Sequence, residues 1–355
     1  MVEYLDGGRI QGSSTLVSSP PATSWKELGR TTLSSTSDSI TVSSLADKDN
    51  IMILTNSFAS GNITGTLRLN TDTGNNYASR WSENGASDGS QNTNPKMVYE
   101  VSTNRTSDRF GYSLINNLSS QEKLCLSHTM TNGSGTGAGN APDRRDVVSK
   151  WANTSNAISS VTLYNTESGD FASGSELVVL GCDNDEADSG TNFWQELASV
   201  ELSSDTDTFD TGTFTAKKYL KYEIYTTCAS GGGATPNLRF NSDTGSNYSF
   251  RHNSNYGSDG TSTNKSRIIV GYGDTDERSY ISGYIINKSD KEKLVINHAS
   301  TDSGHTGAGN VVISKESVGK WTNTSSQITS LQIYNSDSSI GDFSTGSYIK
   351  VYGAD

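Results

Sequence analysis

The sequence predicts an all-β protein made of two tandem antiparallel β-sandwich domains, jelly-roll-like, that arose by internal duplication. Three observations predict this fold class. The second half of the chain repeats the first, short segments alternate apolar and polar residues, and the segments between them are rich in Asn, Ser, Asp and Gly. Alternation with a period of two is typical of half-buried strands, and such polar clusters are typical of turns.

The two copies run from about Trp25 to Cys182 and from Trp194 to Asp355. A period this long indicates a duplicated domain, because solenoid and propeller repeats are much shorter. We therefore expect an N-terminal arm (1–24), a first domain (25–183), a linker (184–191) and a second domain (192–355). The clearest matches are Trp25–Leu28 with Trp194–Leu197, Leu67–Gly74 with Leu238–Gly245, Ser87–Gly89 with Ser258–Gly260, Glu122–Leu124 with Glu292–Leu294, Thr136–Asn140 with Thr306–Asn310, and Lys150–Trp151 with Lys320–Trp321.

Individual segments show the strand pattern. Lys218–Tyr225 and Tyr348–Tyr352 alternate as half-buried strands, whereas Glu176–Leu180 is apolar enough to be buried on both faces. No segment carries a sustained helical stripe. Short strands joined by polar turns favour two packed sheets in each copy.

Composition limits the classes of function. The net charge of −12 argues against nucleic acid as a partner. No stretch approaches a membrane span, and Met1–Asp6 lacks a secretory signal, so we expect synthesis in the cytoplasm. Cys125, Cys182 and Cys228 do not occupy equivalent positions, which indicates free thiols.

The N-terminal segment has no counterpart before the second copy. Gly7–Ser14 followed by Pro20 and Pro21 predicts an extended arm and a stiff turn. Arg9, Ile10 and Gln11 are the candidate docking residues of this arm. The alternative is a frayed tail.

Each copy contains one Asp-Thr-Gly triplet, at Asp72 and Asp243. Paired triplets resemble the catalytic aspartates of a bilobed protease, but their polar surroundings favour turns in which the Asp binds its own backbone. Asp72 and Asp243 are also weak candidate calcium ligands, since the full ligand set is missing.

His128 and His298 occupy equivalent positions near predicted strand ends. They are a paired ligand or acid–base site or, as we favour, structural residues that close a strand. The Thr136–Asn140 and Thr306–Asn310 loops lack the context of a phosphate loop and are predicted loop tips. No nucleophile, base and orienting group recur together, so we expect no enzyme activity, no cofactor and no metal.

Trp81 lies in a predicted polar loop and is replaced by His252 in the second copy. It is the best candidate for a sugar-stacking platform, because an exposed ring beside polar groups binds sugars. The adjacent Arg80 and its counterpart Arg251 are the other candidate ligand-facing residues.

Four strings resemble a module of structural proteins from tailed phages and environmental viruses: Trp25–Ser35, Leu238–Tyr248, Lys320–Thr329 and Gly341–Ser347. The N-terminal Tyr4–Ser14 resembles a leader that accompanies this module. The resemblance covers both copies and implies a β-sandwich structural or host-facing protein of the virion, with no catalytic residues to transfer.

We therefore expect a virion structural protein, either a capsid decoration (cement) protein or an appendage subunit, docked through its N-terminal region. Expected partners are other virion proteins and further copies of the chain in a homo-oligomer such as a trimer. Two alternatives remain open. One is a carbohydrate-binding receptor-recognition fibre or adhesin that contacts host surface glycans, and the other is a double-jelly-roll capsid shell protein.

Overall fold

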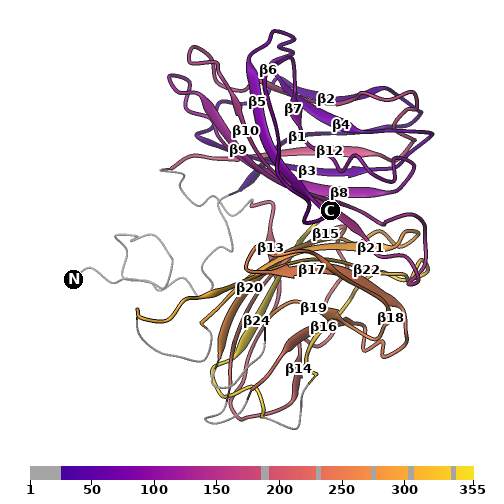
Figure 1. Ribbon diagram of the computed structural model, residues 1–355, viewed down its shortest axis with the longest axis vertical. Helices are drawn as coiled ribbons and strands as arrows, with labels where there is room; N and C mark the ends of the chain where they lie inside the picture. Colours follow the sequence, from indigo (N-terminus) through magenta and orange to yellow (C-terminus); the bar gives the residue numbers. More distant parts are fainter. Residues whose placement is uncertain (1–24, 185–191, 229–232, 273–276, 303–307, 337–340) are drawn as a thin grey trace.

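The computed structural model describes residues 25–184, 192–228, 233–272, 277–302, 308–336 and 341–355, and every regular element in these ranges is a β-strand (Figure 1). The predicted all-β class with two antiparallel sandwich domains is therefore confirmed. The predicted arm residues Arg9, Ile10 and Gln11 lie outside the described residues. No helix long and apolar enough to cross a membrane occurs in the described part of the chain.

The first domain contains two sheets of unequal size. The eight-stranded sheet has the order β1 (Lys26–Thr32), β12 (Glu176–Cys182), β3 (Asn50–Ser57), β8 (Arg109–Asn116), β9 (Lys123–Thr131), β10 (Asp143–Trp151), β5 (Tyr77–Glu83), β6 (Gly89–Asn94). The four-stranded sheet has the order β2 (Ser39–Ser43), β11 (Ser160–Asn165), β4 (Gly65–Leu69), β7 (Met97–Val98).

The second domain repeats this topology strand for strand. Its eight-stranded sheet has the order β13 (Gln195–Glu201), β24 (Tyr348–Ala354), β15 (Tyr219–Thr227), β20 (Arg278–Ile286), β21 (Lys293–Thr301), β22 (Ile313–Trp321), β17 (Tyr248–Ser254), β18 (Gly260–Lys265). Its four-stranded sheet has the order β14 (Thr208–Asp210), β23 (Leu331–Asn335), β16 (Pro236–Phe240), β19 (Ile268–Ile269). Even the irregularities match, since bulges occur at Glu27/Gly29 and again at Glu196/Ala198. The register therefore assigns each residue of one domain a counterpart in the other.

Each domain has its own apolar core between its large and small sheets. Trp151 and Tyr77 stack in the first core, as Trp321 and Tyr248 do in the second. A third core lies between the two large sheets, whose outer faces pack against each other where the domains meet (Figure 1). From the first domain it contains Met52, Leu54, Phe110, Tyr112, Met130, Val178 and Leu180, and from the second Phe193, Trp194, Tyr219, Ile286, Leu294, Ile296, Val318, Tyr352 and Ala354.

This third core explains the continuous apolar run of β12. Every residue from Glu176 to Cys182 is buried, as predicted, because one face of the strand contacts the first core and the other contacts the second domain. The carboxylate of Glu176 also accepts hydrogen bonds from Lys218 and Tyr219 of the second domain. The two domains thus share an apolar interface with polar contacts at its edge.

Lys123 and Lys293 are fully buried at equivalent strand starts. Each ammonium donates to three backbone carbonyls and lies 5.8 Å from the ring centre of the core tryptophan. The carbonyls are those of Ser119, Gln121 and Asn153 in the first domain and of Ser289, Lys291 and Asn323 in the second. Burial lowers the pKa of Lys293 to about 8, but the three bonds satisfy all its donors.

Replacement of either lysine by methionine should destabilise its domain, because three carbonyls lose their donor while the apolar stem is kept. We expect Lys123→Met and Lys293→Met each to lower the free energy of unfolding by about 2–4 kcal/mol. Chemical denaturation measures this. The control is Lys265→Met at an exposed site, which should change stability by no more than about 0.5 kcal/mol, and equal effects at all three sites would contradict the assigned role.

Candidate functional site

The loop between β9 and β10 of the first domain (residues 132–142, the first-domain loop) lies against strands β22, β17 and β18 of the second domain. We call this surface the second-domain groove. Its apolar floor consists of Leu294, Ile296 and Val318, which are nearly fully buried because the large sheet of the first domain also packs against them in the third core. The loop contains Thr136–Asn140, one of the two predicted loop tips. It is therefore part of the domain interface.

Backbone groups of the first-domain loop are held by a buried ion pair. Lys320 Nζ donates to the carbonyl oxygens of Asn132 and Gly135 at 2.7 and 2.9 Å. Glu292, 3.4 Å from Lys320, accepts the backbone N–H of Gly137 at 2.5 Å. Two loop carbonyls thus bind the ammonium of Lys320, and one loop amide binds the carboxylate of Glu292. These hydrogen bonds offset the desolvation cost of burying the ion pair.

The second half of the loop is held by the neighbouring strands. Ser249 Oγ donates to Asn140 O, and Arg251 Nε donates to Pro142 O, both at 2.8 Å. The backbone N–H of Asn264 donates to Ala138 O at 2.8 Å. Arg251, a candidate ligand-facing residue in the sequence, therefore binds the first domain within the same chain.

The equivalent surface of the first domain is open. A groove of about 780 Å³ (the first-domain groove) is lined by residues that include Arg80, Gln91, Leu124, Leu126, Val148 and Lys150. Leu124, Leu126 and Val148 are 60%, 53% and 49% exposed, whereas their counterparts Leu294, Ile296 and Val318 are 2%, 2% and 3% exposed. The structure thus shows the same surface twice, once covered and once uncovered.

The charged groups of the first-domain groove repeat those of its twin. Lys150 and Glu122 form an ion pair at 2.9 Å, with side chains 45% and 41% exposed, where Lys320 and Glu292 are 0% and 5% exposed. Arg80, the counterpart of Arg251, is also exposed and lies 3.5 Å from Asp88. Arg80, a candidate ligand-facing residue in the sequence, therefore lines an open groove.

A second polar cluster lies between the domains. His128 and His298 contact each other with ring centres 4.2 Å apart, and His128 Nδ1 lies 2.8 Å from Asp146 Oδ1. The sequence analysis favours strand-closing roles near strand ends, but both histidines lie inside their strands and meet across the interface. The contact between the two histidines depends on how the domains are arranged, which the sequence does not reveal. Their matching positions in the two copies were the signal in the sequence that marked them as a pair.

The charges around this cluster are largely paired. Arg144 binds three carboxylates, those of Asp146, Asp259 and Glu316. Burial raises the pKa of Asp146, but the hydrogen bond from His128 and the charge of Arg144 outweigh it and place the pKa below its ordinary value. One ligand atom each from His128, Asp146 and His298 lies within 4.8 Å of the others. These residues could hold a divalent transition metal such as Zn²⁺, although Arg144 already neutralises the carboxylate.

The Asp72 and Asp243 carboxylates cap turns and hold the core tryptophans. Asp72 accepts hydrogen bonds from Gly74 N, Asn76 Nδ2 and Trp151 Nε1, and Asp243 accepts the same set from its own copy. All these neighbours are N–H donors, whereas calcium needs oxygen ligands. The geometry therefore supports the turn interpretation over the calcium and protease alternatives.

Trp81 lies in strand β5, not in a polar loop as the sequence analysis expects. Its ring packs against Gly89, where an added Cβ would lie 2.4 Å from the indole, and the Arg145 guanidinium is 5.8 Å from the ring centre. The half-buried ring faces the interior side of the strand, away from the first-domain groove. Its counterpart His252 is 3.0 Å from Lys315, which replaces Arg145.

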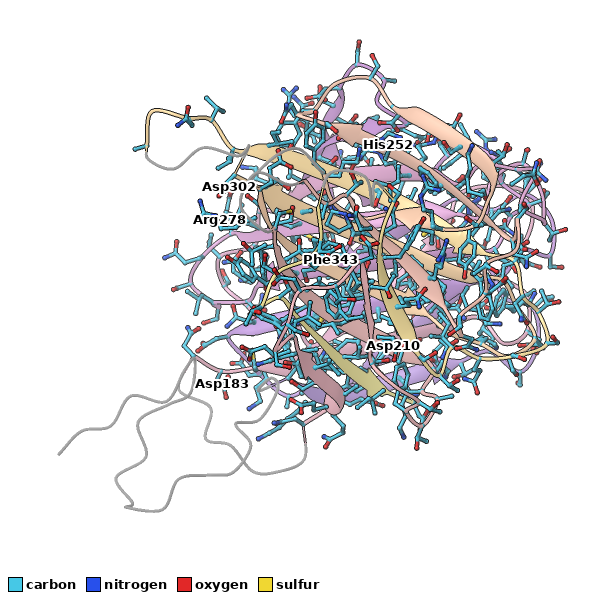
Figure 2. The ribbon with its side chains drawn as sticks, turned by 90° about the horizontal axis from the view of Figure 1, so that it is seen from below. Asp183, Asp210, His252, Arg278, Asp302 and Phe343 are labelled. Carbon is cyan, nitrogen blue, oxygen red and sulfur yellow. The ribbon has the colours of Figure 1, made fainter. Side chains whose placement is uncertain are left out.

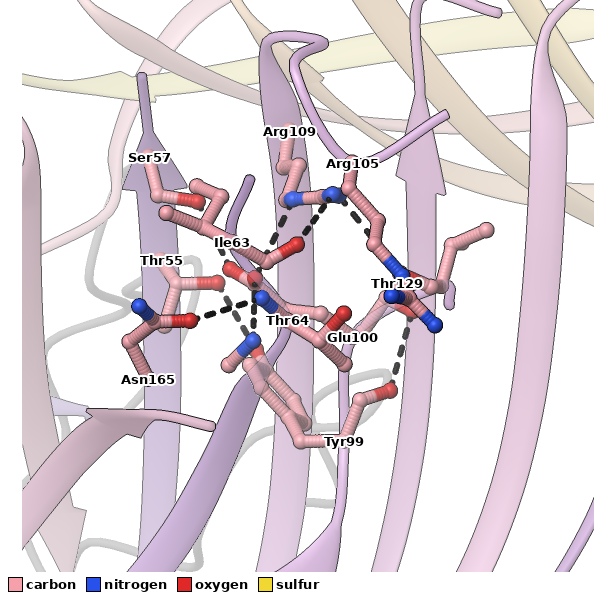
Figure 3. A network of polar contacts seen from close by, with 12 residues as sticks. Thr55, Ser57, Ile63, Thr64, Tyr99, Glu100, Arg105, Arg109, Thr129 and Asn165 are labelled. Carbon is pink, nitrogen blue, oxygen red and sulfur yellow. Dashed lines mark hydrogen bonds and ion pairs between the residues drawn. The ribbon is translucent and has the colours of Figure 1, made fainter. Parts of the chain in front are cut away.

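Another buried ion pair lies inside the first domain (Figure 3). Arg109 Nε and Glu100 Oε2 are 3.2 Å apart and both side chains are only 1% exposed. The Glu100 carboxylate also accepts hydrogen bonds from Ser57 Oγ and Gly65 N, and the Arg109 guanidinium donates a hydrogen bond to Ile63 O. The second domain has Gly271 and Ser279 at these positions. The pair is therefore a structural feature of one copy, without the access that a substrate needs.

Comparisons with known proteins do not identify a family. No protein-family model matches the sequence, and no curated protein matches it. The mouse laminin α1 chain, domains LG4–5, aligns over 95% of this chain and 92% of its own, at 9% identity and a TM-score of 0.19. Ail, the attachment invasion locus protein of Yersinia pestis, aligns over 78% and 98%, at 7% identity and a TM-score of 0.14. Similarity this weak carries no functional argument.

Acidification should loosen the domain interface through His298. Burial, together with the neighbouring His128, lowers the pKa of His298 to about 3, below the ordinary value of about 6.5. The unfolded chain therefore binds a proton that the folded chain excludes, so stability falls as the pH drops from about 6.5 toward 3. Between pH 7 and pH 5 we expect a loss on the order of 1–2 kcal/mol from this group.

His298→Gln isolates this contribution from those of other groups, including Glu316, whose pKa is raised by burial and by Asp146. Urea midpoints at pH 7 and pH 5 should differ less for the variant than for the natural chain. An unchanged pH dependence in His298→Gln would contradict the assignment.

Proposed function

We propose that this protein is a non-catalytic structural subunit of a virus particle, either a capsid decoration protein or an appendage subunit. The observation that carries the proposal is the first-domain groove. Its twin on the second domain is a protein–protein contact, and the open groove keeps the apolar floor and the Lys–Glu pair of that contact. A surface that matches a protein contact favours assembly. We take the assembly to be a virus particle because both copies resemble a module of virion proteins.

The chemistry of the groove supports binding over catalysis. Cys125 is among the lining residues, but its side chain lies in the first core, and burial raises the pKa of its thiol to about 11, so the thiolate needed for attack is scarce. The hydroxyls of Ser79 and Ser149 are buried and bond each other at 2.8 Å, and among the described lining residues no histidine or carboxylate is present to activate them. The groove therefore offers contact area and charge without an activated nucleophile.

The alternatives receive less support from the geometry. A glycan platform needs an exposed ring, but no aromatic residue lines the first-domain groove and the Trp81 ring is packed against Gly89. A double-jelly-roll shell protein is expected to have two strongly diverged barrels, whereas the two copies of this chain remain closely alike in sequence. We keep the decoration or appendage role, with the N-terminal arm and its Arg9, Ile10 and Gln11 as the attachment element.

The test is co-sedimentation with virus particles from which loosely held proteins have been stripped. The full chain should rebind and sediment with the particles, whereas a chain starting at residue 25 should stay in the supernatant. Equal thermal unfolding of the two chains would show that the shorter one is folded. A full chain that stays in the supernatant would overturn the particle role, and equal sedimentation of both chains would overturn docking through the arm.

A further inference from the structure

Within the described residues the contact between a loop and a groove is made once, although both domains carry the groove. The first-domain loop fills the second-domain groove, while the first-domain groove stays open. The second-domain loop (residues 302–313) is the counterpart of the first-domain loop, and its residues 303–307 lie outside the described residues. The first-domain groove thus takes no part in the internal contact, and the second-domain loop is described at residue 302 and from residue 308 onward.

The described part of the second-domain loop is exposed. Val311 and Val312, the counterparts of Ala141 and Pro142, are 83% and 60% exposed. The loop begins at Asp302, which is held by the backbone and the guanidinium of Arg278, and the two residues lie together at the edge of the molecule in Figure 2. The side chains of Val311 and Val312 are thus accessible to a second copy.

We propose that the first-domain groove binds the second-domain loop of another copy of this chain, so that copies associate head to tail. The inference deepens the proposed structural role by naming the partner of the groove. The contact is heterologous, because one surface binds a different surface, and its repetition gives a closed ring or an open filament.

The groups that hold the internal contact are largely present in the first-domain groove. Arg80 replaces Arg251 and would donate to the carbonyl of Val312 as Arg251 does to that of Pro142. The backbone N–H of Thr93 replaces that of Asn264, and both residues have a left-handed backbone with φ near 50°, at 50° and 52°. Leu124, Leu126 and Val148 supply the same apolar floor.

Several contacts are lost between copies, and their loss makes the proposed association weaker than the internal one. The sheet face of the second domain carries Lys221, Glu223 and Lys350 where the first domain contributes Met52, Leu54 and Val178 to the third core. Three polar contacts are lost as well. Ala78 replaces Ser249, so the hydroxyl that donates to Asn140 is absent. Ser314 and Ile313 replace Arg144 and Asp143, which removes the ion pairs to Asp259 and Arg251. We therefore expect reversible, concentration-dependent association.

The experiment measures the mass of the purified full chain in solution across a concentration series, by light scattering or sedimentation. We expect the mass to rise above the 37.9 kDa of one chain. Leu126→Glu places a charge on the apolar floor, and Arg80→Ala removes a donor, so each should weaken association about tenfold or more. Both residues are exposed, so the variants should keep the unfolding midpoint of the natural chain.

Complementation separates a head-to-tail contact from other association. Leu126→Glu retains its loop, and Val312→Glu retains its groove, so neither should form a chain of copies alone while their mixture should form a complex of one copy of each. The control Ser43→Glu, on exposed β2 of the four-stranded sheet, should associate as the natural chain does.

A natural chain that stays at the mass of one copy would overturn the inference, and so would Leu126→Glu or Val312→Glu variants that associate like the control. This assay contains no particle, so its failure would leave the result of the co-sedimentation test unaffected.

Discussion

The packing of the two large sheets against each other is the constraint on which the rest of the structure depends. A sheet in a two-layer domain normally buries one face and exposes the other. Here the outer face of each large sheet carries apolar side chains, and the third core buries many of them. This contact fixes which loop reaches which groove, brings His128 to His298, and leaves one groove exposed.

The interface is asymmetric because the two copies differ on this face. Met52, Leu54 and Val178 contribute to the third core from the first domain, whereas their counterparts are Lys221, Glu223 and Lys350. Lys221 and Glu223 pair with each other at 2.7 Å. A charged patch covers an apolar floor only with costly desolvation, so the sheet face of the second domain does not return the sheet-to-sheet part of the contact that it receives. The second domain can therefore offer a first-domain groove its loop, but not its sheet face.

The sequence predicted the features that depend on local chemistry. Alternation identified the strands, the apolar run of β12 predicted burial on both faces, and the polar surroundings of Asp72 and Asp243 predicted turns. It did not predict sheets of eight and four strands, because strand order depends on pairings between residues far apart in the chain. Trp81 was misplaced since the strand β5 continues through residues of low apolar character, and Arg251 and the two histidines could not be assigned without knowing how the domains meet.

The same ion pair has different consequences in the two grooves. In solvent, a pair such as Lys150 and Glu122 contributes less than about 1 kcal/mol to folding, so stability gives little reason for both residues to be present. Under a bound loop, the equivalent Lys320 and Glu292 are desolvated, and each is satisfied by backbone groups that fit only one loop position. Burial therefore makes this ion pair a determinant of register, since a misplaced loop would leave both buried charges without their backbone hydrogen-bond partners. Lys150 and Glu122 occupy the positions equivalent to Lys320 and Glu292, so they could bind the backbone of a loop in the same way. For this reason we propose that the first-domain groove binds the equivalent loop of another copy.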